Sequence, residues 1–208
     1  MTDELTRRGI LRTGMAGMAG IAAALTVLSA GAATARPRDT APGVLADVRA
    51  AARDFGVPPE LLLALGYANT RWEMPPPGAG DYRFGDPEAR GSHGVMALVR
   101  NPWEDTLGLA AELTGLPVQA LMTDRAANLR GGAAVLAHSQ GRQRPGRSRD
   151  WLPAVAGHGG GGPRIQAATG IGSGDLYAEQ VGDVLAGGFD HRTTSKQRVV
   201  LAPQGQEL

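Results

Sequence analysis

The sequence contains no cysteine, and its only lysine is Lys196, beside 20 arginines. Without cysteine, a disulfide framework, a thiolate nucleophile and a cysteine-based zinc site are all excluded. Histidine is also rare, because the four histidines stand singly at positions 93, 138, 158 and 191. The sequence therefore predicts neither a metal site nor a bound cofactor.

Aromatic residues make up only 4% of the chain, and none of its apolar runs is long and strongly hydrophobic. The apolar fraction of 42% and the charged fraction of 20% are nevertheless those of a globular protein. The length of 208 residues allows one ordinary domain with a tail, or two small domains. With 31 glycines and 14 prolines, we expect long loops.

The first 35 residues have the pattern of an export signal. A pair of arginines, Arg7-Arg8, precedes an uncharged stretch over residues 13–35 that is rich in Ala and Gly. Ala33-Thr34-Ala35 then offers small residues at the two positions that signal peptidase reads. The pattern predicts a twin-arginine-type signal over residues 1–35 and a secreted or wall-associated protein. A membrane anchor is the alternative, which the length allows but the many Gly and Ala residues disfavour.

Residues 36–208 carry equal numbers of acidic and basic side chains. Because binding to phosphates requires a basic excess, a nucleic acid is not expected as the partner.

Helical signals dominate residues 42–189. Apolar residues between Val44 and Phe55 follow a helical spacing that ends at Gly56, and Leu61–Ala68 is nearly all apolar. Gly115 is expected to end a helix over Thr106–Thr114, and Asp124 to cap one over Arg125–Ser139. No strand signal of any length is found, so the sequence predicts an all-α domain of five to seven short helices. Residues 192–208 are expected to be a polar tail or linker.

Four segments in this order resemble the lysozyme-like lytic transglycosylase domain. The resemblance is to the version found N-terminal to the amidase domain in secreted actinobacterial N-acetylmuramoyl-L-alanine amidases. The segments are LLLALGYANTRW (61–72), GSHGVMAL (91–98), DRAANLRGGAAVLA (124–137) and WLPAVAGHGGG (151–161). The resemblance implies a lysozyme-like helical domain over residues 36–191 and a tail similar to the start of a linker. It also implies a truncated amidase lacking its amidase domain, or a module acting with a separate amidase.

The resemblance places Asn69 at the position of the family's catalytic glutamate. Cleavage of a glycan strand requires a carboxylic acid that protonates the glycosidic oxygen, and an amide cannot supply that proton. Glu73 lies one helical turn further on and is the alternative acid, although it is also expected as a solvated carboxylate. The family's late Tyr-Asn pair is likewise replaced here, by His158-Gly159.

The same resemblance implies that peptidoglycan glycan strands are the ligand, and it supplies the remaining candidate residues. Among the three tryptophans, Trp72 is the preferred candidate for stacking on a sugar, with core packing as the alternative. The implied substrate-binding residues are Thr70, Trp72, His93, Met96, Asn128 and His158. Three functions remain open: a non-catalytic wall-binding module, an active muramidase or transglycosylase using Glu73, and a secreted structural protein without wall affinity.

Overall fold

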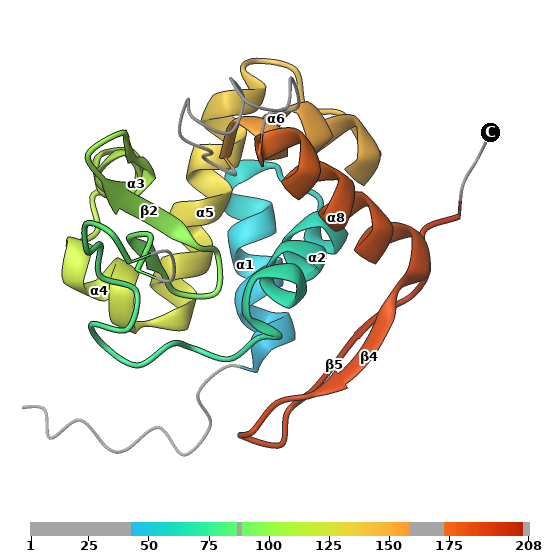
Figure 1. The fold of residues 1–208 in the computed structure, drawn as a ribbon. Coiled ribbons are helices and arrows are strands. Elements are labelled where there is room, and N and C mark those ends of the chain that lie inside the picture. The colour runs from blue at the N-terminus through green and yellow to red at the C-terminus, as the bar shows by residue number, and fades with distance from the viewer. Residues whose placement is uncertain (1–42, 87–88, 159–172, 206–208) are drawn as a thin grey trace, which may run out of the picture. The chain divides into compact units, whose positions relative to one another are not determined.

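The computed structural model describes residues 43–86, 89–158 and 173–205 (Figure 1). The expected signal at residues 1–35 lies outside the described residues. Seven α-helices and one 3₁₀ turn, η1, occur in the described part of the chain. They are α1 (Val44–Phe55), α2 (Pro59–Thr70), α3 (Thr106–Thr114), α4 (Val118–Thr123), α5 (Arg125–Gln140), η1 (Ser148–Trp151), α6 (Leu152–His158) and α8 (Ser173–Gly187).

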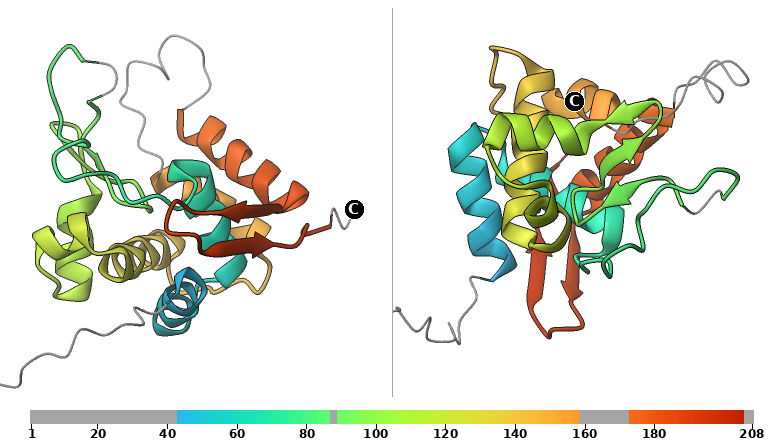
Figure 2. Two further views of the ribbon diagram at one scale, coloured as in Figure 1. Left: turned by 90° about the horizontal axis from the view of Figure 1, so that it is seen from below. Right: turned by 90° about the vertical axis from the view of Figure 1, so that its left-hand side faces the viewer.

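Two antiparallel sheets accompany the helices, so the all-α prediction is wrong and the fold is mixed α and β. The first sheet has the order β1 (Ser92–His93), β2 (Leu98–Asn101), β3 (Glu104–Asp105). The second is a hairpin of β4 (Phe189–Arg192) and β5 (Arg198–Leu201). Figure 2 shows the long loop before β1 and the β4–β5 hairpin projecting from the helices in different directions.

The strands are two to four residues long, which is too short for an alternating pattern to be recognised. In β5 the alternation exists but is minimal: Val199 and Leu201 are buried, whereas Val200 is 42% exposed. Strand β5 lies within residues 192–208, so residues expected as a polar tail supply a strand to the core.

The β2–β3 turn is held by a side chain, because Asn101 Oδ1 accepts hydrogen bonds from the backbone N–H groups of Trp103 and Glu104.

The helix boundaries follow the local signals that the sequence carries. Gly56 and Gly115 both adopt the left-handed conformation and end α1 and α3, as predicted. The Asp124 side chain accepts a hydrogen bond from Ala127 N–H and caps α5, also as predicted.

The centre of the core is α2, in which Leu61–Leu65 are buried. Glycines on α5 allow close packing there: an added Cβ at Gly132 would lie 2.7 Å from Met96, and one at Gly131 would lie 2.8 Å from Leu121. The absence of side chains at these two glycines therefore allows the loop between β1 and β2 to pack closely against α5.

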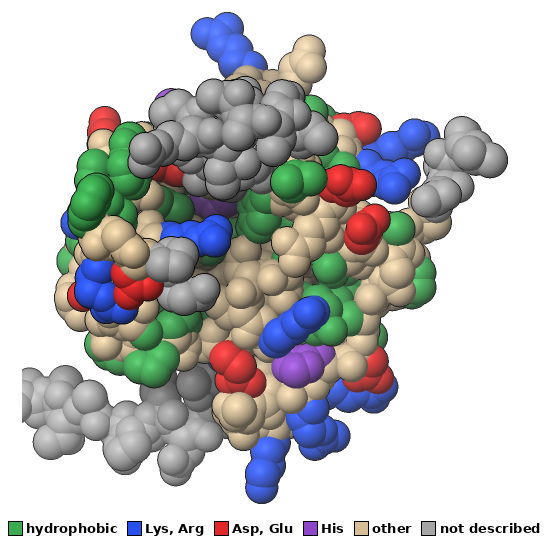
Figure 3. All heavy atoms as spheres, in the orientation of Figure 1, with side chains coloured by type: hydrophobic (Ala, Val, Ile, Leu, Met, Phe, Trp, Pro, Cys, Tyr) green, Lys and Arg blue, Asp and Glu red, His purple; other side chains and the backbone are tan. Residues whose placement is uncertain are grey.

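The β4–β5 hairpin is attached to the C-terminal half of α2. The rings of Tyr67 and Phe189 stack with centroids 4.0 Å apart, and the Arg71 guanidinium lies 4.1 Å from the centre of the Tyr67 ring. Gln197 Oε1 accepts a hydrogen bond from Val44 N–H at the start of α1. Figure 3 shows both acidic and basic side chains gathered over the hairpin. The hairpin is consequently part of the domain and borders the end of α2, where Asn69 lies.

Candidate functional site

The four sequence segments of the resemblance meet at residues 93–96, which comprise the end of β1 and the start of the loop that leads to β2. Asn69 from the end of α2 donates a hydrogen bond from Nδ2 to the carbonyl oxygen of Val95 at 3.1 Å. Asn128 from α5 bonds to His93 and Met96, and His158 from the end of α6 bonds to Met96. Hydrogen bonds that span up to 62 positions of the chain thus form one cluster, which we call the 93–96 cluster.

The fully buried side chain of Asn128 holds this loop in place by hydrogen bonds. Its Oδ1 accepts a hydrogen bond from Met96 N–H at 2.7 Å, while its Nδ2 donates to the carbonyl oxygens of His93 and Leu121. Gly94, at φ +71°, passes so close that an added Cβ would lie 2.2 Å from the Asn128 side chain. Asn128 therefore positions the loop and is not accessible to a substrate.

Met96 and His158 are also buried and act within the cluster. The Met96 side chain packs on Gly132, and its carbonyl oxygen accepts a hydrogen bond from His158 Nε2 at 3.1 Å. Burial lowers the pKa of His158, and the bond to a carbonyl requires the ring proton on Nε2. The Nδ1 atom is buried without a hydrogen-bond partner among the described residues. Neither side chain reaches the surface, so both support the site without lining it.

Asn69 is held from two sides and remains half-buried. While its Nδ2 donates to Val95, its Oδ1 accepts a hydrogen bond from the Tyr177 hydroxyl at 2.8 Å. Burial raises the pKa of Tyr177, so the phenol stays protonated and continues to donate. Position 69 is therefore surrounded by one acceptor and one donor, which a neutral amide satisfies together at every pH.

Glu73, the alternative acid, is engaged elsewhere. Its two carboxylate oxygens accept hydrogen bonds from the Thr194 backbone N–H and hydroxyl in the β4–β5 turn, each at 2.7 Å. These bonds, that of the hydroxyl first, lower the pKa of Glu73, and nearby His191 lowers it further. A general acid needs the opposite shift, so this carboxylate is suited to anchoring the hairpin and not to donating a proton.

Thr70 is half-buried, and its hydroxyl donates to the carbonyl oxygen of Gly66 within its own helix at 3.4 Å. Trp72 is 2% exposed, so its ring is not available to stack on a sugar. Arg71 and Trp72 both have positive φ values, which fold the indole back against α2. An added Cβ at Gly66 would lie 2.6 Å from that ring, so Gly66 is what makes room for it. Trp72 is a core residue.

The exposed tryptophan is Trp103, in the β2–β3 turn, with 60% of its surface accessible. Its ring meets Tyr82 of the long loop edge to face, with centroids 5.6 Å apart and an interplanar angle of 87°. Phe84 on the same loop is 90% exposed. Sequence reasoning did not separate these aromatic residues from the core, because no helical or strand pattern surrounds them.

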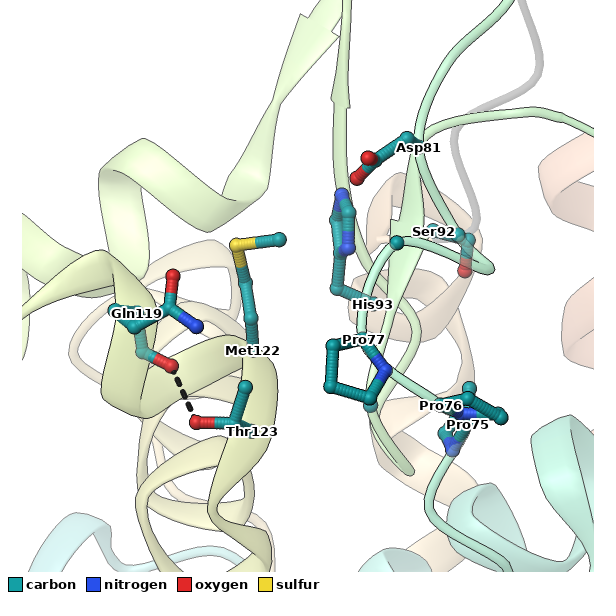
Figure 4. A pocket seen from close by; sticks show the side chains of 12 residues that line it. Pro75, Pro76, Pro77, Asp81, Ser92, His93, Gln119, Met122 and Thr123 are labelled. Carbon is teal, nitrogen blue, oxygen red and sulfur yellow. Dashed lines mark hydrogen bonds between the residues drawn. The ribbon is translucent and has the colours of Figure 1, made fainter.

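His93 lines a cavity of about 220 Å³ between the long loop, β1 and α4 (Figure 4). Its side chain is 7% exposed, and burial lowers its pKa, with Arg100 lowering it further and Asp81 raising it. His93 is thus the sequence-predicted site residue that is both buried and directed into a cavity.

Two further side chains were missed by sequence reasoning. Tyr177 lies 108 residues beyond Asn69, and no local signal connects them. Glu104, the first residue of β3, has a raised pKa because of burial, and its Oε1 is buried without a hydrogen-bond partner among the described residues. A carboxyl with a raised pKa is a candidate for acid chemistry, although Glu104 does not belong to the 93–96 cluster.

Within the described ranges, no group of three or more His, Asp or Glu side chains is arranged to hold a metal ion. In the same part of the chain, none of the helices combines the length and the apolar character that a membrane crossing requires.

No protein-family model matches the chain, and no curated protein and no solved structure is significantly similar to it.

Proposed function

We propose that this chain is an exported peptidoglycan-binding domain, related to lysozyme-like lytic transglycosylase domains, that does not cleave the glycan strand. The proposal includes export through the twin-arginine signal at residues 1–35 and a location outside the cell or at the wall. It also includes action beside an amidase that is carried by a separate chain.

The observation that carries the proposal is the state of position 69. The resemblance assigns the catalytic acid to this position, and here an amide bridges the Val95 carbonyl oxygen and the Tyr177 hydroxyl. The four segments of the resemblance converge around it, which supports a common frame. Because an amide has no acidic proton, position 69 cannot protonate the leaving group of a glycan strand. The proposal is therefore a domain with the family's arrangement of helices but without its general acid.

The catalytic alternative is disfavoured by the surroundings of Glu73. A carboxylate that accepts two hydrogen bonds and has a lowered pKa is ionised at neutral pH. For it to donate a proton to a glycosidic oxygen, both bonds to the β4–β5 turn would have to break first.

The wall contacts are assigned to the side chains that are accessible. Asn69 and Thr70 are half-buried and have hydrogen-bonding capacity left for sugar hydroxyl or acetamido groups. The exposed ring of Trp103, braced by Tyr82, takes the stacking role that the sequence suggested for Trp72.

The test combines sedimentation with purified wall sacculi and mass analysis of released muropeptides. The wild-type chain is expected to sediment with sacculi at low salt and to release no anhydro- or reducing-end muropeptide. Trp103→Ala is expected to weaken sedimentation by roughly 1–3 kcal/mol, the usual loss for one aromatic anchor.

The variant pair Asn69→Glu and Asn69→Gln tests the assignment of position 69. The two side chains have the same size, but only the first can donate an acidic proton, so only Asn69→Glu should gain weak cleavage activity. Cleavage by the wild type that disappears in Glu73→Gln or in Glu104→Gln would replace the proposal by an active glycosidase. A wild-type chain that stays in the supernatant would favour the structural protein without wall affinity.

A further inference from the structure

A second candidate site is the cavity that His93 lines, which shares His93 and Gly94 with the 93–96 cluster. Figure 4 shows its two walls: α4 with Gln119, Met122 and Thr123 on one side, and the long loop with β1 on the other. The full lining consists of Pro75, Pro76, Pro77, Gly78, Gly80, Asp81, Ser92, His93, Gly94, Gln119, Met122 and Thr123.

His93 is the unusual member of this lining. The residue is 7% exposed, and no hydrogen bond joins its ring to another described residue. The ring nitrogens are not among the fully enclosed unpaired atoms of the described residues, so they stay accessible for a hydrogen bond. Figure 4 shows the ring in the cavity, with the Asp81 carboxylate beside it. The ring is therefore positioned to bond to a molecule inside the cavity.

The cavity closes around this ring by a close approach of the backbone. An added Cβ at Gly80 would lie 1.8 Å from the carbonyl oxygen of Ser92 and 3.2 Å from His93 Nδ1. Only glycine at position 80 brings the long loop against β1, and Asp81 follows directly. The cavity is consequently a built feature of the fold and depends on one residue.

The charge and the hydrogen-bonding groups of the lining favour a positively charged ligand that donates hydrogen bonds. Among the described residues that line the cavity, Asp81 is the only acidic side chain and there is no lysine or arginine. The nearby charge of Arg100 is paired with Asp105 at 3.2 Å. On the opposite wall the Thr123 hydroxyl is directed to the Gln119 carbonyl oxygen, to which it donates its proton. The prolines and Met122 supply apolar surface to the lining.

We propose that this cavity binds a primary ammonium group carried on a short aliphatic chain, with Asp81 as the counter-ion and His93 as a hydrogen-bond acceptor. The apolar walls enclose the methylene groups. A volume of about 220 Å³ lies below the 300–1,000 Å³ of pockets for drug-sized ligands and suits a group as small as a lysine side chain. The inference does not depend on the proposed wall-binding function.

The experiment is an NMR titration of the full chain, in which backbone amide shifts report binding. The probes are Nα-acetyl-L-lysine methylamide, cadaverine as the free amine, and the Nε-acetylated form of the first probe as its uncharged match. Both amines are expected to shift the amides of Gly80, Ser92 and Gly94 with about millimolar affinity, as is usual for ligands of this size. Preference for the lysine derivative over cadaverine would identify a peptide as the source of the amine.

Asp81→Asn is expected to weaken amine binding by about three- to tenfold, since Asp81 is exposed and its charge is partly screened. The matched control is Asp86→Asn on the same loop, because Asp86 pairs with Arg83 and does not line the cavity. Thermal melts of both variants verify folding. Equal binding of the Nε-acetylated probe, unchanged binding by Asp81→Asn, or stronger binding of acetate or N-acetylglucosamine would each overturn the proposal.

Discussion

Replacing Asn69 by Asp changes one atom type and tests how position 69 is held. The Asn69 amide donates to Val95 and accepts from Tyr177, and only a protonated Asp reproduces both bonds. An ionised Asp leaves the Val95 carbonyl oxygen without its donor and places a negative charge against it, at a cost of about 1–3 kcal/mol. The bond from Tyr177 offsets part of that cost, so we expect a loss near 2 kcal/mol at pH 7.

The loss should depend on pH in a defined direction. Because burial and the Val95 carbonyl favour the protonated form, the folded-state pKa of the new carboxyl lies above the unfolded value of about 3.9. Its protonated form therefore supports the fold below that value, and the support disappears as the pH rises through the folded pKa. Urea unfolding of the variant and of wild type at pH 3.5 and pH 7.5 measures this, with Asn69→Ala as a control whose deficit should not change with pH. An Asn69→Asp deficit that is equal at both pH values would refute the assigned bonding pattern.

Three further outcomes follow from the described contacts. Glu73→Gln should lower the free energy of unfolding by less than about 1 kcal/mol at pH 7. Because the folded-state pKa of Glu73 is lowered, the stability that the carboxylate contributes is lost only as the pH falls through that pKa. The difference from wild type should therefore vanish only when urea unfolding is measured well below pH 4.5. Gly66→Ala should destabilise by about 1–3 kcal/mol in urea unfolding through overlap with the Trp72 ring, whereas Gly157→Ala, which meets nothing within 4 Å, should be neutral or stabilising. Trp72→Ala should lower stability by about 3–5 kcal/mol, while Trp103→Ala should change it by no more than about 0.5 kcal/mol, so that a calorimetric scan separates core from surface tryptophan; comparable losses in the two would contradict these burials.

The helices were predictable because their signals are local. A left-handed glycine at position 56 or 115 and a capping side chain at Asp124 act within one turn of the residues they terminate. The strands were not predictable for the opposite reason. β1 and β3 contain two residues each and exist only through their pairing with β2, which no window of the sequence reports.

The candidate site was predictable in part. The prediction that Asn69 occupies the acid position rests on the resemblance alone. Its bonding partners could not be predicted, since one is the backbone of Val95 and the other is Tyr177, far along the chain. The sugar-stacking role was predicted for Trp72 because the residue follows the end of a helix, where a side chain can be exposed. In the structure Trp72 is buried. Two consecutive positive φ values reverse its direction here, and the sole sequence trace of this is Gly66.

The surroundings of position 69 bear on why an amide is stable there. A carboxyl between a carbonyl oxygen and a phenol hydroxyl satisfies both neighbours only while it keeps its proton, and the same condition makes it useful as a general acid. An amide satisfies both neighbours whatever the pH, so position 69 does not titrate and cannot supply a proton. Glu73 is held as an ionised anchor by the hairpin at the end of α2. In the function that we propose, these two side chains are the reason why the chain binds glycan strands without cleaving them.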